Sequence, residues 1–181
     1  SSSVSMHFDA TEKNKVPLHM TWSDGGIKPF HPDDLPADVP IEANGVLMIG
    51  EKGVISCDAY GADPRLYIKG EAVQIPEKVK IDEPEFGHQR QWVDACKAGF
   101  NSKEHQSLTS SFDYSGPLTE TVLMGNIAIR SYMLRKGENS RRPEYIGRKK
   151  LLWEGNEMKI KNLEEANQFV GREYRKGWEL T

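Results

Sequence analysis

The stretch FDYSGPLTETVLMGNIAIRSY, residues 112–132, decides the fold of this chain. Pro117 is typical of a first helical position, because its fixed φ suits a helix start and its missing N–H needs no partner there. The sequence therefore predicts a helix that begins at Gly116 or Pro117. Its apolar positions cover two faces, and they are Leu118, Val122, Leu123, Ile127, Ile129 and Tyr132. Such a helix is expected to be covered on most sides and to pack on a sheet.

Gly125 lies in the middle of this predicted helix. A glycine there costs about 1 kcal/mol of helix stability relative to alanine. We therefore expect a second backbone to pass close to Gly125.

The strands on either side are predicted from alternating apolar residues. Segments 4–8 and 18–22 form one expected hairpin, and segments 46–49 and 54–60 form a second one around a tight turn. Between the hairpins lies a long loop at 23–45 that contains four prolines. Loops of this length in compact domains are usually functional or mobile.

The remaining elements have weaker signals in the sequence. Residues 65–68 could pair briefly, residues 76–84 resemble a linker, and a helix is expected over 86–98 with Gly99 as its C-terminal cap. Two short strands at 150–153 and 158–161 precede a last helix, for which Asn162 and Glu165 form a plausible capping box.

This order of elements predicts an α+β fold, with helices packed on one face of a mainly antiparallel open sheet. At 181 residues the chain is expected to be a single domain, 1–181.

The composition excludes several classes of protein. With 24 basic and 27 acidic side chains the net charge is −3, which argues against a dedicated nucleic-acid or anionic-membrane surface. The densest basic cluster, between Arg141 and Lys150, is interpreted as a solvated turn and strand edge. No apolar run reaches the 18 or so residues of a membrane span. Cys57 and Cys96 have no metal-site spacing and are expected to be buried free thiols.

Motifs that would carry chemistry on their own are missing from the sequence. There is no GxGxxG fingerprint, P-loop, HExxH, GxSxG or EF-hand loop. We therefore assign no catalytic, cofactor-binding or metal-binding residue from motifs.

Six stretches, in this order along the chain, resemble the C-terminal domain of the Gfo/Idh/MocA (glucose-fructose oxidoreductase and inositol dehydrogenase) family, in its bacterial dehydrogenase branch. They are LHMTWSDGG (18–26), YGADPRL (60–66), QWVDACKAG (91–99), FDYSGPLTE (112–120), EANQF (165–169) and REYRKGW (172–178). The resemblance implies hydride transfer at a sugar or polyol carbon. It also implies an N-terminal Rossmann domain for NAD or NADP, and association of two or more copies through the sheet.

The chain departs from the family pattern in important places. The Rossmann half and the Glu-Lys-Pro segment with the catalytic lysine are missing, so no catalytic residue can be carried over. Ser23 stands where an aromatic residue is common, and residues 135–148 form an insertion. Because the chain starts at Ser1 without a methionine, it is expected to be cut from a longer protein. We expect the chain alone to be inactive and to hold no cofactor, and we leave its compartment open.

Five residues are predicted to contact a carbohydrate substrate: Trp22, Asp24, Arg65, His88 and Tyr114. A tryptophan face can stack on a sugar ring, and Asp24 follows at the start of the long loop, where it could accept from hydroxyl groups. His88 lies in the first turn of its helix on the apolar face, where the helix dipole favours a neutral imidazole. Tyr114 precedes the central helix and could point into a cleft.

Each of these residues also has a structural interpretation. Asp24 could serve only the turn, Trp22 could belong to the core, and His88 could be a satisfied structural histidine. Arg65 could pair with Asp58 or Asp63.

Asp113 could cap the central helix.

Two further function classes stay open. One is a non-enzymatic carbohydrate-binding or scaffold domain with Trp22, Tyr60, Tyr114 and Trp153 as stacking platforms. The other is a hydrolase that uses Asp24, Asp113 and His88.

Overall fold

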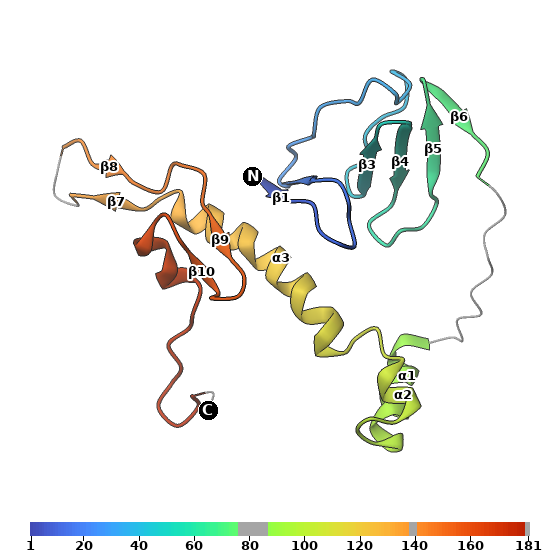
Figure 1. Cartoon of the computed structure of the whole chain (residues 1–181). Coiled ribbons are helices and arrows are strands. Elements are labelled where there is room, and N and C mark those ends of the chain that lie inside the picture. Colours follow the sequence, from blue (N-terminus) through green and yellow to red (C-terminus); the bar gives the residue numbers. More distant parts are fainter. Residues whose placement is uncertain (76–86, 138–140, 180–181) are drawn as a thin grey trace. The chain divides into compact units, whose positions relative to one another are not determined.

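The computed structural model describes residues 1–75, 87–137 and 141–179, and in this part the chain has an α+β fold, as predicted (Figure 1). The strands are β1 (Ser3–Phe8), β2 (Leu18–Ser23), β3 (Val46–Gly50), β4 (Gly53–Cys57), β5 (Arg65–Ile68), β6 (Glu71–Val73), β7 (Arg135–Lys136), β8 (Glu144–Tyr145), β9 (Trp153–Glu154) and β10 (Lys159–Ile160). The helices are α1 (Gly87–Ala98), α2 (Lys103–Gln106), α3 (Phe112–Ser131) and the 3₁₀ helix η1 (Glu164–Phe169). None of the described helices is long and apolar enough to cross a membrane.

The chain divides into two compact units. One contains Ser1–Ser3 and Ser23–Arg90, and the other contains Val4–Trp22 and Gln91–Thr181. Within the described residues the strands form four separate sheets, where one open sheet was expected. The antiparallel pairing itself is confirmed.

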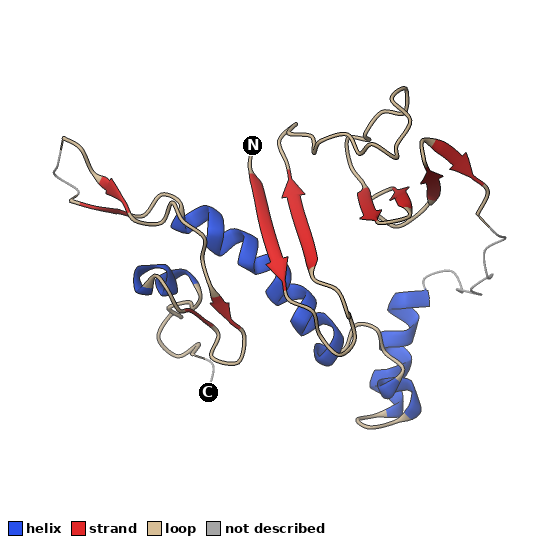
Figure 2. Cartoon of the chain, turned by 45° about the horizontal axis from the view of Figure 1, so that its top comes forward, coloured by secondary structure: helices blue, strands red, loops and turns tan. Residues whose placement is uncertain are grey.

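The first unit is built on a four-stranded antiparallel sheet in the order β3-β4-β5-β6 (Figure 2). The predicted hairpin at 46–60 is confirmed, and only Glu51 and Lys52 connect its strands. One face of the sheet contains Val54 and Tyr67, which are cross-strand partners and are both buried. On the other face, Met48, Ile55, Leu66 and Val73 form a row across all four strands.

The long loop predicted at 23–45 begins after Ser23, the last residue of β2, and contains turns and no further regular element. Asp34 fixes it to the turn between β5 and β6. Its carboxylate accepts a hydrogen bond from the Lys69 N–H at 2.9 Å, and its carbonyl accepts from the Gly70 N–H at 3.2 Å. Leu35, the next residue, is buried. The loop is thus an ordered part of this unit.

The second unit has its core between helix α3 and the C-terminal elements. Ile127 of α3 packs with Ile160, Leu163 and Ala166 in the buried cluster. Partly buried apolar side chains surround the cluster: Leu134, Ile146, Leu151, Trp153, Phe169 and Val170. Helix α3 therefore packs on η1 and the β9–β10 hairpin, and only its C-terminal half contributes to this core. The predicted first hairpin, β1–β2, is confirmed.

The start of α3 was predicted wrongly. The helix begins at Phe112 with Ser111 as its N-cap, so Pro117 lies inside it. Ser111 has the extended backbone that an N-cap requires, with φ −64° and ψ 157°. The Ser115 hydroxyl donates to the Ser111 carbonyl at 2.9 Å, which helps to hold the added turn. Asp113 lies in the first turn and is not the cap.

Helix α3 is also less covered than its pattern predicted. Leu118, Val122, Leu123 and Ile129 are all exposed. A Cβ built on Gly125 would meet no atom within 4 Å, so the expected close approach of a second backbone is wrong.

Three further expectations need correction. Asn162 does not form a capping box, because its side chain accepts from the Leu152 N–H at 2.9 Å and donates to the Lys150 carbonyl at 2.8 Å. The last helix is a 3₁₀ helix with Leu163 at its N-cap. Cys96 is exposed and Cys57 is half-buried, so neither is a buried thiol. Gly99, by contrast, is confirmed as the cap of α1, with φ 92° and its N–H donating to the Ala95 carbonyl.

Candidate functional site

The side chain of Asp24, a predicted substrate contact, is already bound within the first unit. One carboxylate oxygen accepts from the Ser2 N–H at 2.7 Å and the other from the Ser2 hydroxyl at 2.9 Å. These bonds, the hydroxyl's first, hold the pKa of Asp24 below its ordinary value of 3.8. Gly25 and Gly26 follow with φ of 61° and 88°, so the segment has the turn chemistry that the structural interpretation required.

Arg65 and His88 belong to the same unit, and both are exposed. Arg65 lies opposite Ser56 at the start of β5. Its expected partner Asp58 instead accepts from the N–H groups of Tyr60 and Ala62, at 2.8 and 2.7 Å. His88 is the second residue of α1, but its exposure corrects the expectation that it lies on a covered apolar face.

Trp22 and Tyr114 belong to the second unit, and both present large exposed aromatic surfaces. Trp22 is 58% exposed in β2, and Tyr114 is 62% exposed in the first turn of α3. Trp22 is therefore not a core residue. Both rings could stack on a sugar, and their role as substrate contacts stays a prediction.

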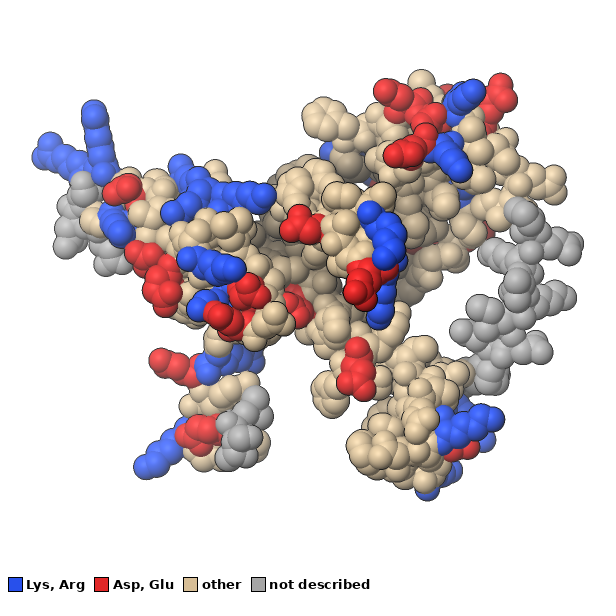
Figure 3. All heavy atoms as spheres, in the orientation of Figure 1, with Lys and Arg blue, Asp and Glu red and all other residues tan. Residues whose placement is uncertain are grey.

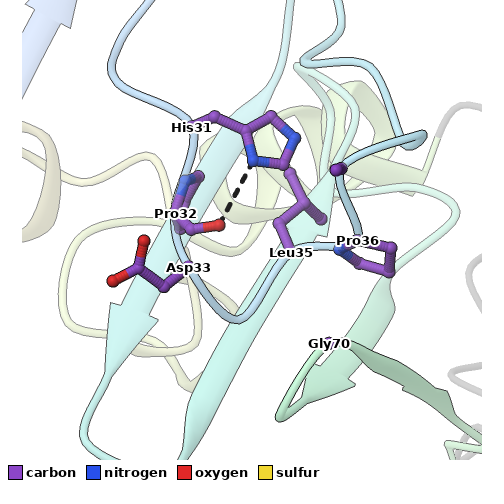
Figure 4. Close-up of a pocket in the computed structure, with 7 residues that line it drawn as sticks. His31, Pro32, Asp33, Leu35, Pro36 and Gly70 are labelled. Atoms are coloured by element: carbon purple, nitrogen blue, oxygen red, sulfur yellow. Dashed lines mark hydrogen bonds between the residues drawn. The ribbon is translucent and has the colours of Figure 1, made fainter.

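Two shallow hollows in the described residues are considered as candidate sites, and none of the five predicted residues lines either of them. The first, of about 500 Å³, lies in the long loop (Figure 4). Its lining is largely proline and leucine, with one imidazole and one carboxylate: His31, Pro32, Asp33, Leu35, Pro36, Ala37 and Gly70.

The side chain of His31 contacts backbone carbonyl oxygens of the same loop and is not free to act as an acid or base. Its Nδ1 lies 3.2 Å from the Pro32 carbonyl oxygen, and its Nε2 lies 3.0 Å from the Val39 carbonyl oxygen. A neutral imidazole has one N–H, so it donates to one of these carbonyls at a time. Both nitrogens therefore face backbone acceptors, and Asp33 is the remaining ionisable group of the hollow.

The second hollow lies between the β7–β8 ribbon and η1, and both acidic and basic residues line it. Figure 3 shows Lys and Arg side chains mixed with Asp and Glu side chains over the surface of the chain. Lys136 lies 3.5 Å from a Glu165 oxygen, and Lys149 donates to the Asn162 carbonyl at 3.4 Å. The Arg148 guanidinium lies 3.5 Å from the centre of the Tyr145 ring. Since acids and bases alternate here, the hollow has no dominant charge that would select an anionic or a cationic ligand.

A half-buried hydrogen bond between α3 and β9 was also missed in the sequence. The Trp153 indole N–H donates to a Glu120 carboxylate oxygen at 2.6 Å, and both residues are half-buried. Trp153 therefore has a structural role, and its role as a stacking platform stays a prediction. Nothing in the local pattern links two residues 33 positions apart.

The arrangement therefore offers exposed aromatic and polar groups but no assembled catalytic device within the described residues. No cluster of three or more histidine, cysteine, aspartate or glutamate side chains that could hold a metal occurs in that part of the chain. Comparisons with protein-family models, curated proteins and solved structures find no match to this chain.

Proposed function

We propose that the chain is the substrate-binding and oligomerisation module of an NAD(P)-dependent oxidoreductase that acts on a sugar or polyol. The observation that carries the proposal is the uncovered apolar face of the four-stranded sheet. The resemblance of six stretches to the C-terminal domain of Gfo/Idh/MocA enzymes supports the reaction type.

The apolar face extends across the whole width of the sheet. Met48, Ile55, Leu66 and Val73 are cross-strand neighbours, and Met48 and Ile55 are 57% and 39% exposed. An antiparallel sheet is stable with one face in water when that face is polar, but here the row is apolar. Such a surface is typical of an interaction site.

A second copy of this chain is the partner that suits this face. The row contains no charge, and Glu71, which the register places on the same face opposite Ile68, lies in the edge strand β6, at the rim of such an interface. Two twisted antiparallel sheets pack face to face at a distance of about 10 Å, with their apolar side chains interdigitated. This geometry agrees with the sheet-mediated association that the family resemblance implies.

The carbohydrate part of the proposal is supported by Trp22 and Tyr114. Both rings are exposed, and aromatic faces bind the apolar faces of sugar rings. NAD or NADP would be held by a Rossmann domain outside this chain, and the chain alone would therefore be inactive.

The proposal is tested first by the mass of the native protein in its source and by the oligomeric state of the chain. We expect a native product heavier than 20.5 kDa with an N-terminal extension that binds NAD(P), and a homodimer in sedimentation experiments. A native product of 20.5 kDa would contradict the oxidoreductase assignment. A monomer at high concentration would contradict the oligomerisation role.

A non-enzymatic carbohydrate-binding or scaffold domain is the second candidate. It is favoured by a third exposed aromatic side chain in addition to Trp22 and Tyr114, that of Tyr60, which is 97% exposed. Sugar binding that is unchanged by an added Rossmann partner, and that is lost on Trp22→Ala, would favour this alternative.

A further inference from the structure

Two histidines face each other on the polar side of the β1–β2 hairpin. The contacts between the strands place Ser3 opposite Ser23, Ser5 opposite Thr21, and His7 opposite His19. Side chains alternate between the two faces of a ribbon, so these three pairs share one face. The histidines are therefore direct cross-strand neighbours, held by the register of the hairpin.

The two imidazole rings lie close together and nearly parallel. Their centroids are 4.2 Å apart, and their planes differ by 16°. In the described residues, neither ring takes part in a hydrogen bond or an ion pair. His31 differs, because both its nitrogens face carbonyl oxygens, and His105 Nδ1 accepts from the Asn101 N–H. His7 and His19 thus combine unoccupied ring nitrogens with a neighbouring imidazole.

We propose that His7 and His19 together bind one divalent transition-metal ion of borderline softness, Cu²⁺ or Zn²⁺. Imidazole nitrogen is a good ligand for these ions and a poor one for Mg²⁺ or Ca²⁺. Two Zn–N bonds of about 2.0–2.1 Å at a tetrahedral angle place the nitrogens about 3.4 Å apart. Rings with centroids at 4.2 Å reach this separation by rotation about χ2, which is a soft torsion in histidine.

The site would be open and exchangeable. No third histidine, cysteine, aspartate or glutamate completes a cluster at this position in the described residues. Water or a ligand from outside would then occupy the remaining coordination positions, as happens at metal sites that do not serve only a structural role. The site would involve neither the apolar sheet face nor the predicted sugar contacts. Its test is therefore independent of the test of the proposed function.

The test is calorimetric titration of the full chain with CuCl₂ and with ZnCl₂ at about pH 7.5, since protons compete with metal ions for their ligands at lower pH. We expect one Cu²⁺ per chain, bound more tightly than Zn²⁺ in accordance with the Irving–Williams order. His7→Ala and His19→Ala should each weaken binding by at least the roughly 10–100-fold that loss of an outer-shell partner costs at metal sites. MgCl₂ should give no binding.

His88→Ala is the matched control, because His88 is equally an exposed histidine but has no imidazole neighbour in its unit. It should keep the affinity of the parent chain. Circular dichroism should show that the three variants keep the parent fold, and the copper electron paramagnetic resonance spectrum should show coupling to two imidazole nitrogens. Equal binding in all three variants, or the absence of copper binding to the parent chain, would overturn the proposal.

Discussion

At the scale of single residues, Gly147 and Gly125 differ in the space that surrounds them. Gly147 is packed against backbone, whereas Gly125 has open space at the position of a Cβ. A Cβ on Gly147 would overlap the carbonyl oxygen of Ser131, the buried last residue of α3. We expect Gly147→Ala to lower the free energy of unfolding by at least about 2 kcal/mol, because backbone must move to accept the methyl group. Urea denaturation followed by circular dichroism measures the change.

Gly125→Ala is the control for this prediction. It adds the same methyl group at a position with no atom within 4 Å, in the middle of α3. Alanine is the better helix former, so this variant should gain up to about 1 kcal/mol. Equal losses in both variants would contradict the packing described around Ser131.

Asp24 gives the chain a predictable acid dependence. The pKa of its carboxyl is lowered by the hydrogen bonds from Ser2, so folding favours the ionised form. Its contribution to stability is therefore complete above the ordinary value of 3.8 and is lost as the pH falls through the lower folded pKa. Asp24→Asn should be slightly less stable than the parent chain at neutral pH. The stabilities of the two chains should converge once the pH is below the pKa of Asp24 in the folded chain. Denaturation across a pH series measures this; a difference independent of pH would contradict it.

At the scale of elements, the bond between Trp153 and Glu120 joins β9 to α3. Replacing Trp153 by phenylalanine keeps an aromatic ring but removes the N–H that donates at 2.6 Å. Hydrogen bonds to charged groups contribute about 1.5–3 kcal/mol, and this one is half-buried. We therefore expect Trp153→Phe to lower the free energy of unfolding by about 1–2 kcal/mol. Glu120→Gln keeps an acceptor oxygen and should lose less. A change under about 0.5 kcal/mol in Trp153→Phe would mean that the bond contributes little to stability.

Elements with strong local signals could be predicted from the sequence. The elements that pack against them could not. Alternation predicted the β1–β2 and β3–β4 hairpins, and Gly99 predicted the end of α1. The start of α3 was missed because Pro117 is favoured at a first helical position, whereas Ser111 is also a good N-cap and allows one more turn. Periodicity shows which residues share a face of a helix but does not show what covers that face.

The candidate site was harder to predict for the same reason. The bonds that engage Asp24 come from Ser2, 22 positions earlier, and the carboxylate of Asp34 is bound by Lys69, 35 positions later. Neither partnership leaves a local pattern in the sequence. Residue type therefore indicated which groups could bind a sugar, while long-range contacts decided which were available.

At the scale of the whole molecule, one pair of lysine substitutions tests the proposal that two copies of the chain associate through the apolar row. Ile55 lies in the apolar row between Met48 and Leu66, while Ile49 pairs with Val54 and so belongs to the opposite face. A lysine at position 55 would place two like charges in a symmetric interface. We therefore expect Ile55→Lys to weaken dimerisation by more than about tenfold in sedimentation equilibrium, a change of about 1.4 kcal/mol.

Ile49→Lys adds the same charge at a position that is 65% exposed, and it should dimerise like the parent chain. Circular dichroism should show that both variants keep the α+β fold, since both positions are exposed. If both variants associate like the parent, the dimer forms through another surface and the apolar row has another partner. If only Ile55→Lys dissociates, the face that contains the apolar row is the interface, because both variants replace an exposed isoleucine by lysine on paired strands of one sheet and differ in the face that carries the charge.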